Sequence, residues 1–126
     1  PYRVEVSSSR GALQLIQHDV ARASSSVLLV APAEAYPLLA PALRRPAGQG
    51  LELRLYSVGD AELGFASVVS LKGELAWPGT PLISVVDERA ALVATRAGGD
   101  VTGHWGSAPA FVSAARLAAL TLAAGA

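Results

Sequence analysis

Cysteine and methionine are absent from this sequence of 126 residues, and so is any long uninterrupted apolar stretch. Without cysteine the chain forms no disulfide, has no thiolate nucleophile and lacks the best ligands for structural zinc. No apolar stretch approaches the roughly 20 residues of a membrane-spanning helix, and no signal sequence or lipidation motif is recognisable. We therefore expect a cytoplasmic protein without a membrane partner. Because the chain opens with Pro1 and contains no methionine, we also expect a processed protein or an excised domain.

A surplus of charge of one sign is also missing, because ten basic residues balance ten acidic ones. The charges are scattered and form no stripe that could neutralise successive phosphates of a nucleic acid. Direct binding of this chain to DNA is therefore not expected. The hydrophobic fraction of 52% is nevertheless high for a globular domain, so the excess must face a core or a partner. Abundant alanine and arginine hint at a GC-rich bacterial genome.

The first half of the chain has the pattern of alternating strands and helices. Residues 2–6 alternate in polarity and run into serines that suit a helix cap, and residues 13–23 place apolar side chains at helical spacing. The apolar run 26–31 is typical of a parallel strand covered on both faces. A short or kinked helix is expected within 32–45, and residues 51–56 alternate strictly as a third strand. This order predicts parallel strands joined by right-handed crossovers.

The second half has the pattern of short successive strands followed by one helix. Strands are expected at 65–71, 82–87, 90–95 and 101–106. Residues 87–89 form a tight connection between two of them, and residues 108–124 predict a strong closing helix. We therefore predict a single α/β domain over residues 1–126. Its mixed sheet has a parallel βαβαβ first half and a β-meander second half, and the C-terminal helix closes it.

No metal or nucleotide cofactor is expected. His18 and His104 are the only histidines, and neither has a second close ligand of a metal-binding type. The glycine patterns that cradle nucleotide phosphates do not occur. His18 falls on the solvent side of its predicted helix. His104 lies next to Trp105 between two glycines, where imidazole and indole offer a surface for stacking and hydrogen bonding, although packing also explains a tryptophan at a strand end.

No serine has the surroundings of a catalytic nucleophile. None lies in a G-x-S-x-G elbow or beside a plausible base, so helix capping and turn formation explain the two serine triplets. Asp87 and Glu88 are adjacent acids in a predicted turn, where side chains normally point apart. Trp77 belongs to a Trp-Pro-Gly turn and is either a lid over a pocket or a loop anchor.

The order and character of several segments resemble the effector domain of TrmB-type transcriptional regulators. The resemblance is carried by residues 11–23, 26–34, 39–55, 82–93 and 103–112. In that family a helix ending in alanine leads to a strand, a second helix and a turn before another strand. Paired strands around an aspartate follow, and then the segment before the last helix. The resemblance spans most of the chain and rests on pattern rather than on an exclusive signature.

TrmB effector domains are similar to one half of the phospholipase D fold, so the resemblance implies a phospholipase D-like architecture. Enzymes of that superfamily use histidine, lysine and aspartate at relative positions zero, two and seven. With Asp87 as the aspartate, Thr80 stands at the histidine position and Leu82 at the lysine position. Threonine cannot replace the imidazole nucleophile, and leucine cannot hold phosphate charge. We therefore predict that the chain is not an enzyme.

The resemblance implies a ligand-sensing and dimerisation domain of a bacterial regulator, with DNA bound only through a helix-turn-helix domain outside this chain. The family's ligands are typically sugars, held by an aromatic platform and polar groups. The candidate ligand-binding residues are Trp77, Asp87, His104 and Trp105. Sugar sites also tend to use several carboxylates and amides, whereas this sequence has no asparagine. The ligand class therefore stays open.

A symmetric homodimer is expected, because the predicted closing helix is apolar on more than one side. If the sheet covers one side, then Leu117, Leu120 and Leu122 are left to seek a second surface. Two alternatives remain. A structural or protein-interaction module would have an apolar surface without a pocket. A small hydrolase, phospholipase D-like or using Ser107 or His104, would need a base within reach of a nucleophile inside a cleft.

Overall fold

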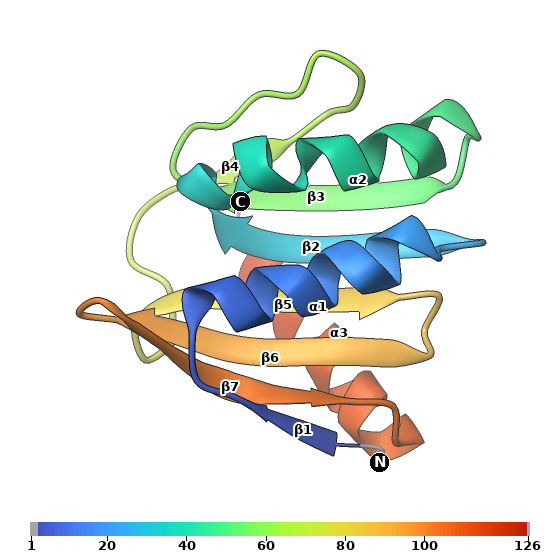
Figure 1. Cartoon of the computed structure of the whole chain (residues 1–126). Coiled ribbons are helices and arrows are strands. Elements are labelled where there is room, and N and C mark those ends of the chain that lie inside the picture. Colours follow the sequence, from blue (N-terminus) through green and yellow to red (C-terminus); the bar gives the residue numbers. More distant parts are fainter. Residues whose placement is uncertain (1–2, 126) are drawn as a thin grey trace.

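The computed structural model describes residues 3–125, which form a mixed seven-stranded sheet with helices on both faces (Figure 1). In chain order the strands are β1 (Arg3–Val6), β2 (Ser26–Pro32), β3 (Glu52–Val58), β4 (Val69–Leu71), β5 (Thr80–Val86), β6 (Ala90–Ala97) and β7 (Asp100–Gly106). The helices are α1 (Ser9–Ala21), α2 (Tyr36–Gly48) and α3 (Pro109–Ala123), with a 3-10 turn, η1 (Ala33–Ala35), directly before α2. Across the sheet the strand order is β1-β7-β6-β5-β2-β3-β4. The predicted α/β class with a mixed sheet and a closing helix is confirmed.

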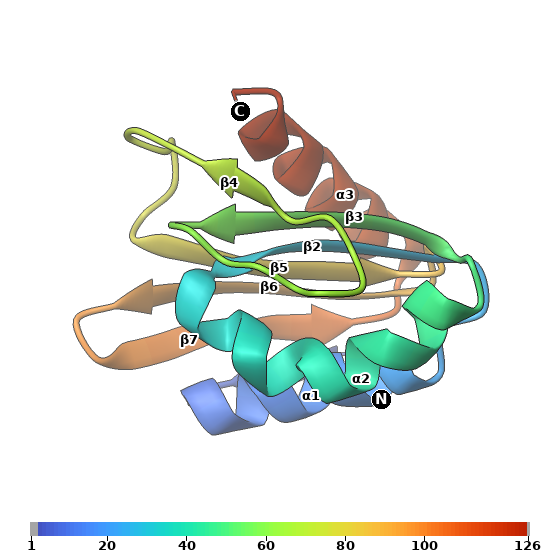
Figure 2. The same cartoon turned by 90° about the horizontal axis from the view of Figure 1, so that it is seen from above.

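The sheet is the middle of three layers. Helices α1 and α2 lie side by side on one face, and α3 packs on β5, β6 and β2 from the other (Figures 1 and 2). A strand in the middle of such a stack is covered on both faces and must be apolar throughout. Accordingly, β2 is buried continuously from Val27 to Pro32. The apolar run at this position is thereby explained.

The first half contains the predicted parallel strands, with one difference in their order. Strands β2 and β3 are adjacent and parallel, with Leu29 opposite Leu55. Strand β1 points the same way as β2 but lies at the far edge, where it pairs antiparallel with β7. Its residues 3–5 are exposed and only Val6 is buried, which suits an edge strand. Tyr2, the first residue of the strand predicted at 2–6, lies outside the described residues.

The second half contains the predicted meander, formed by β5, β6 and β7. The strand expected at 65–71 differs, because only Val69–Leu71 is a strand and it pairs parallel with β3. Residues 59–68 form an irregular segment whose apolar side chains pack on the core under α1 and α2. Within it, the Phe65 ring lies 4.7 Å from the guanidinium carbon of Arg44. The alternating pattern here reflects loop side chains that alternate between core and solvent.

Helix α2 is longer than the short or kinked helix that its prolines predict. Pro37 stands in the first turn, where a missing N–H costs little, whereas Pro41 and Pro46 lie inside the helix. The helix continues because its buried face is strongly held. Tyr36 is completely buried at its start, and its hydroxyl donates to the Tyr56 carbonyl at 2.6 Å. Tertiary packing therefore outweighs the local cost of the two prolines.

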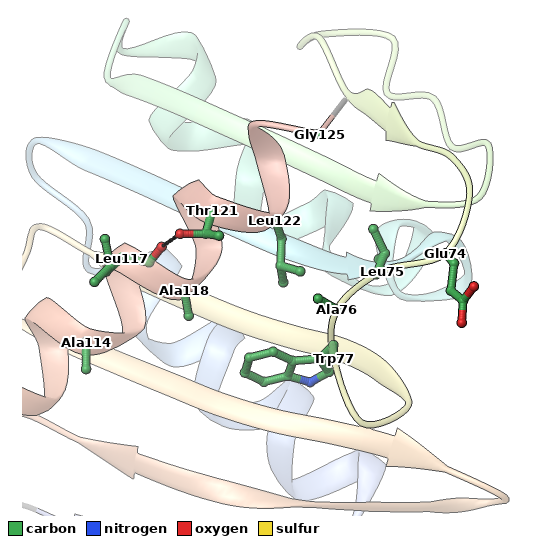
Figure 3. Close-up of a pocket in the computed structure, with 10 residues that line it drawn as sticks. All are labelled: Glu74, Leu75, Ala76, Trp77, Ala114, Leu117, Ala118, Thr121, Leu122 and Gly125. Carbon is green, nitrogen blue, oxygen red and sulfur yellow. Dashed lines mark hydrogen bonds between the residues drawn. The ribbon is translucent and has the colours of Figure 1, made fainter.

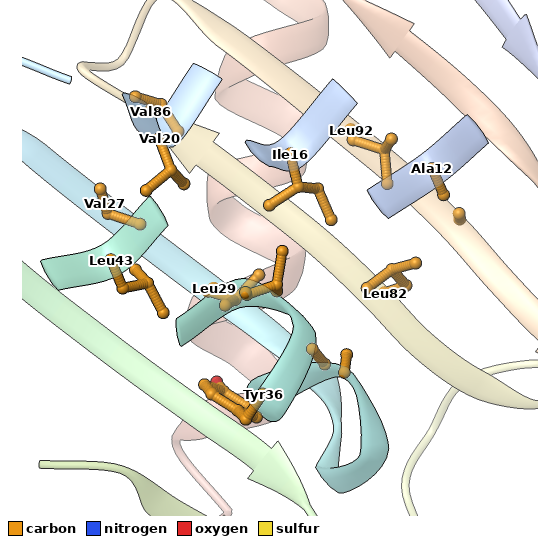
Figure 4. Close-up of a cluster of buried hydrophobic side chains, with 14 of the residues drawn as sticks. Ala12, Ile16, Val20, Val27, Leu29, Tyr36, Leu43, Leu82, Val86 and Leu92 are labelled. Atoms are coloured by element: carbon orange, nitrogen blue, oxygen red, sulfur yellow. The ribbon is translucent and has the colours of Figure 1, made fainter. Parts of the chain in front are cut away.

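Two apolar cores lie on the two faces of the sheet. Figure 4 shows the larger one, in which Ile16 of α1 and Leu43 of α2 meet Leu29 of β2. The next residue of β2, Val30, points to the other face and packs in the core beneath α3, together with Ala119. Ser8 caps α1, since its Oγ accepts from the backbone N–H of Gly11 at 3.0 Å. Capping thus explains this serine, as predicted.

No helix among residues 3–125 combines the length and the apolar character that crossing a bilayer requires. The same residues contain no cluster of three or more histidine, cysteine, aspartate or glutamate side chains with the geometry of a metal site.

Candidate functional site

A cavity of about 450 Å³ lies beside α3, between this helix and the segment that joins β4 to β5 (Figure 3). Its lining consists of Glu74, Leu75, Ala76 and Trp77 from the segment, with Ala114, Leu117, Ala118, Thr121, Leu122 and Gly125 from α3 and the residues after it. Ligand sites in proteins typically enclose about 300–1,000 Å³ and are mostly apolar with a few polar groups. The cavity has this volume and a mostly apolar lining, and it is open to solvent along the exposed side chains of Ala114, Leu117 and Thr121. It is the candidate functional site.

Helix α3 presents a different side to the cavity than to the sheet. Val112, Ala115 and Ala119 are buried against the sheet. Ala114 and Ala118, four residues apart and so on one face of the helix, line the cavity instead. Small side chains at these two positions leave the space open.

The other wall depends on a glycine turn. Gly79 has a φ of 111°, and a Cβ at this position would stand 2.6 Å from the carbonyl oxygen of Arg96. Only glycine therefore lets the chain pass this close to β6. The backbone N–H of Gly79 donates to the Trp77 carbonyl at 2.9 Å, and the Trp77 N–H donates to the Leu75 carbonyl at 2.8 Å. These tight turns hold Trp77 against α3.

The Trp77 indole extends toward Ala118 and forms the aromatic surface of the cavity (Figure 3). Its Nε1 is buried and has no hydrogen-bond partner among residues 3–125. A buried indole N–H normally finds an acceptor. The ring is therefore held by packing and not by a specific hydrogen bond. Trp77 both packs on the core under α3 and lines the cavity, so neither of the two interpretations made from the sequence, a lid over a pocket or a loop anchor, is singled out.

Asp87, one of the candidate ligand-binding residues, makes hydrogen bonds that hold two segments of the chain together. Its carboxylate accepts from the backbone N–H groups of Ser24, Ser25 and Ser26, at 2.8–3.1 Å, and from the hydroxyls of the first two. Burial opposes ionisation of this carboxyl, but the hydrogen bonds outweigh it and lower the pKa of Asp87 to about 2. Asp87 thus ties the β5–β6 turn to the segment between α1 and β2.

The turn at Asp87 is the predicted tight connection. Asp87 and Glu88 have φ values of 57° and 53°. They are the two central residues of the turn closed by the Arg89 N–H, which donates to the Val86 carbonyl at 3.0 Å, within the three-residue connection 87–89. Aspartate tolerates this region better than most side chains because its short polar group bonds locally. The carboxylate is thereby aimed at the serine backbone and away from the cavity beside α3.

Trp105 lies on the opposite face of the sheet from the cavity. It packs against the core under α1 and α2, and its Nε1 donates to Asp19 Oδ2 at 2.8 Å. Burial raises the pKa of Asp19, and the Trp105 hydrogen bond only partly offsets it. Asp19 and Asp87 line a second, more polar cavity of about 230 Å³ together with Arg22 and Arg89. Trp105 does not line this second cavity, but it donates a hydrogen bond to Asp19, which does.

The His104 side chain points to the other face of the sheet from Trp105, because successive side chains of a strand point to opposite faces. Its cross-strand neighbour Val93 belongs to the core under α3, whereas Leu92, opposite Trp105, belongs to the core under α1 and α2. The imidazole and the neighbouring indole therefore do not form one surface. Of the four predicted ligand residues, only Trp77 lines the cavity beside α3, and the four do not form one site.

Thr80 and Leu82, which the resemblance aligns with the histidine and lysine of phospholipase D enzymes, both belong to β5. Thr80 is its first residue, and Leu82 is 3% exposed within the core under α1 and α2. The fold thus turns the Leu82 side chain into the apolar core. Arg96, the cross-strand neighbour of Thr80, forms a salt bridge from its Nη1 to Glu34 Oε2 at 2.6 Å, which holds the pKa of Glu34 below its usual value. Neither Arg96 nor Glu34 supplies an imidazole.

No family model and no curated protein sequence matches this chain. Solved structures do match it. TrmBL2, described as an archaeal chromatin protein with a novel mode of DNA binding, superposes with a TM-score of 0.73 at 11% identity, over 96% of this chain and 51% of its own. This chain therefore spans about half of TrmBL2.

Two other matches cover both partners almost completely. NucT from Helicobacter pylori has a TM-score of 0.71 at 12% identity, covering 98% of this chain and 96% of its own. The phospholipase D family member Nuc from Salmonella typhimurium has a TM-score of 0.64 at 12% identity, covering 98% and 94%. The chain therefore has a phospholipase D-like fold, as the resemblance implied. At these identities the likeness establishes the fold alone.

Sequence reasoning missed most of the cavity, including Leu75, Ala118 and Thr121. None of these has a residue type that signals chemistry. The only available signal was the combination of Trp77 in a proline-glycine turn with the small residues of the closing helix, which lie far away in the chain and meet only in the fold.

Proposed function

We propose that this chain is the ligand-sensing and dimerisation domain of a TrmB-like bacterial regulator, without catalytic activity of its own. Its small-molecule site is the cavity beside α3, and DNA is contacted through a domain outside this chain. The observation that carries the proposal is an apolar cavity with an aromatic wall, Trp77. The proposed lack of catalysis rests on the resemblance, which aligns Thr80 and Leu82 with the nucleophile and lysine of phospholipase D enzymes. An apolar cavity with an aromatic wall suits the binding of a small molecule. Phosphoryl transfer needs the histidine and lysine in whose place the resemblance puts Thr80 and Leu82.

Dimerisation is supported by the exposure of α3. Leu117 is 68% exposed, the most exposed of the large apolar side chains in the described residues, and it borders the cavity. The earlier candidate Leu122 is 7% exposed and packs in the core, so it supports α3 from beneath. We place the dimer contact at Leu117. A ligand in the cavity would then touch the same helix as the partner subunit, which gives a physical route from ligand to dimer.

The dimer is tested by light scattering on the wild-type chain and on Leu117→Glu. We expect a dimer for the first and a folded monomer for the second, because a charge buried in a symmetric contact is placed there twice. Leu38→Glu is the matched control, since Leu38 is a similarly exposed leucine at 56%, on α2 at the opposite face. A wild-type monomer at high concentration contradicts the dimer, and dissociation by the control alone places the contact on α2.

The absence of catalysis is tested with bis-p-nitrophenyl phosphate as a generic phosphodiester. We expect turnover no faster than in buffer, because the described residues of β5 offer neither imidazole nor ammonium to the substrate. Turnover that disappears in Thr80→Ala, while the circular dichroism spectrum is unchanged, would establish an enzyme and reject this part of the proposal.

A further inference from the structure

The chemistry of the cavity lining indicates what kind of molecule fits it. Glu74 is the only charged side chain among the lining residues, and no basic residue is among them. The carboxylate of Glu74 lies at the outer end and points away from the indole (Figure 3). A bound anion would lose part of its hydration without gaining a positive partner, which is unfavourable. A neutral molecule or a cation meets no such cost.

The polar groups needed for a sugar are also missing. Thr121 supplies the only side-chain hydroxyl of the lining, and its Oγ1 already donates to the Leu117 carbonyl at 2.8 Å. The Trp77 Nε1 is buried in the wall. Each sugar hydroxyl that enters an apolar site without a hydrogen bond weakens binding. A sugar would bring several such groups.

The shape of the cavity favours a flat molecule. One wall is the Trp77 indole, and the facing wall is the alanine side of α3, with Ala114 and Ala118 (Figure 3). A planar apolar ring can rest on the two small side chains beside the indole without a steric clash. Aromatic faces also attract cations. Positive charge is therefore tolerated where negative charge is not.

We propose that the cavity beside α3 binds a small, flat, largely apolar molecule that is neutral or cationic, and that it excludes sugars and anions. This inference rests on the proposed ligand-sensing function and names the ligand class of the same site. A second copy of the chain is the competing occupant. Its helix would have to enter through the border at Leu117, whereas the cavity volume of about 450 Å³ matches a small molecule.

The test uses naphthalene probes that differ only in charge, with maltose as the sugar. The intact chain is titrated calorimetrically with 2-naphthylmethanol, 2-naphthylmethylamine and 2-naphthoate at pH 7. We expect the alcohol and the ammonium to bind with similar affinity, the carboxylate at least tenfold more weakly, and maltose not at all. Variants of the lining residues show whether this order of affinities is due to the cavity.

Ala118→Phe fills the cavity and should abolish binding of the alcohol. Should this variant not fold, Thr121→Phe fills it from an exposed position. Ala110→Phe is the matched control, because Ala110 is exposed on the same helix and does not line the cavity. Glu74→Lys should strengthen binding of the carboxylate relative to the ammonium by at least threefold.

The outcomes separate the ligand class from the function. Maltose or 2-naphthoate binding most tightly, with loss in Ala118→Phe, would overturn the ligand class and leave the sensing function standing. Binding of no probe would overturn the inference, and the light-scattering experiment on Leu117→Glu would then decide independently whether the domain dimerises. Binding that is lost only when the chain dimerises would identify a second copy as the occupant.

Discussion

Replacing Asp87 by asparagine removes a charge that holds two distant segments together. The carboxylate collects hydrogen bonds from the backbone N–H groups of residues 24–26 and from two serine hydroxyls. Asparagine also tolerates the positive φ of 57° at this position. The substitution therefore tests the charge and its hydrogen bonds without adding backbone strain.

The size of the effect follows from the pKa. A carboxyl pKa that falls from 3.8 in the unfolded chain to about 2 in the folded one corresponds to about 2.5 kcal/mol. The turn is partly open to solvent, so screening reduces this to about 1–2 kcal/mol. Because the folded pKa is the lower one, this contribution is complete above pH 4 and is lost as the pH falls toward 2.

Urea unfolding of the wild type and of Asp87→Asn, measured between pH 7 and pH 2, tests the reasoning. We expect the variant to be about 1–2 kcal/mol less stable at pH 7, with the difference shrinking below pH 4. Asp100→Asn, at an exposed aspartate, is the control and should leave the stability at pH 7 within about 0.5 kcal/mol. A difference between wild type and Asp87→Asn that stays constant down to pH 2 would refute the account.

Three further predictions concern buried polar groups. Ser84 Oγ is buried without a hydrogen-bond partner in residues 3–125, so Ser84→Ala should be neutral or stabilising by up to about 1 kcal/mol in the same urea unfolding assay. Ser57 Oγ donates to the Gly59 carbonyl at 2.7 Å, so Ser57→Ala should destabilise the fold by about 1 kcal/mol. Trp105→Phe removes the hydrogen bond to Asp19, whose pKa is raised by burial, and should cost about 1–3 kcal/mol at pH 7. The destabilisation by Trp105→Phe should be smaller at pH 4, where Asp19 is closer to neutral. Adding Asp19→Asn to Trp105→Phe should restore part of the lost stability. Equal destabilisation at both pH values would argue against this role of the hydrogen bond.

Local patterns predicted the elements whose burial is regular. The apolar run before Pro32 became a central strand, and the alternation at 51–56 became its parallel neighbour. The position of β1 was not readable, because its pairing with β7 joins residues about a hundred positions apart. Likewise, residues 65–68 alternate like a strand, but they pack as a loop on the core under α1 and α2, and pairing with β3 begins only at Val69.

The candidate site was predictable only at Trp77. Composition and motif can point to a residue of unusual chemistry, but they cannot say which face of a strand it occupies relative to a distant helix. His104 and Trp105 are neighbours in the sequence and lie on opposite faces, whereas Trp77 and Ala118 are far apart in the sequence and line one cavity. Asp87 was readable as a turn residue, and its serine partners are a consequence of the folded chain.

The central claim is that ligands enter the cavity beside α3, and the two tryptophans allow a direct measurement of it. In a nitrogen-15 NMR spectrum of the chain, each indole N–H gives its own signal. On addition of 2-naphthylmethanol, we expect the Trp77 indole signal and the backbone signals of Ala118 and Leu122 to shift, while the Trp105 indole signal stays in place. Shifts centred on Trp105 and the turn at Asp87, with Trp77 unmoved, would contradict the claim.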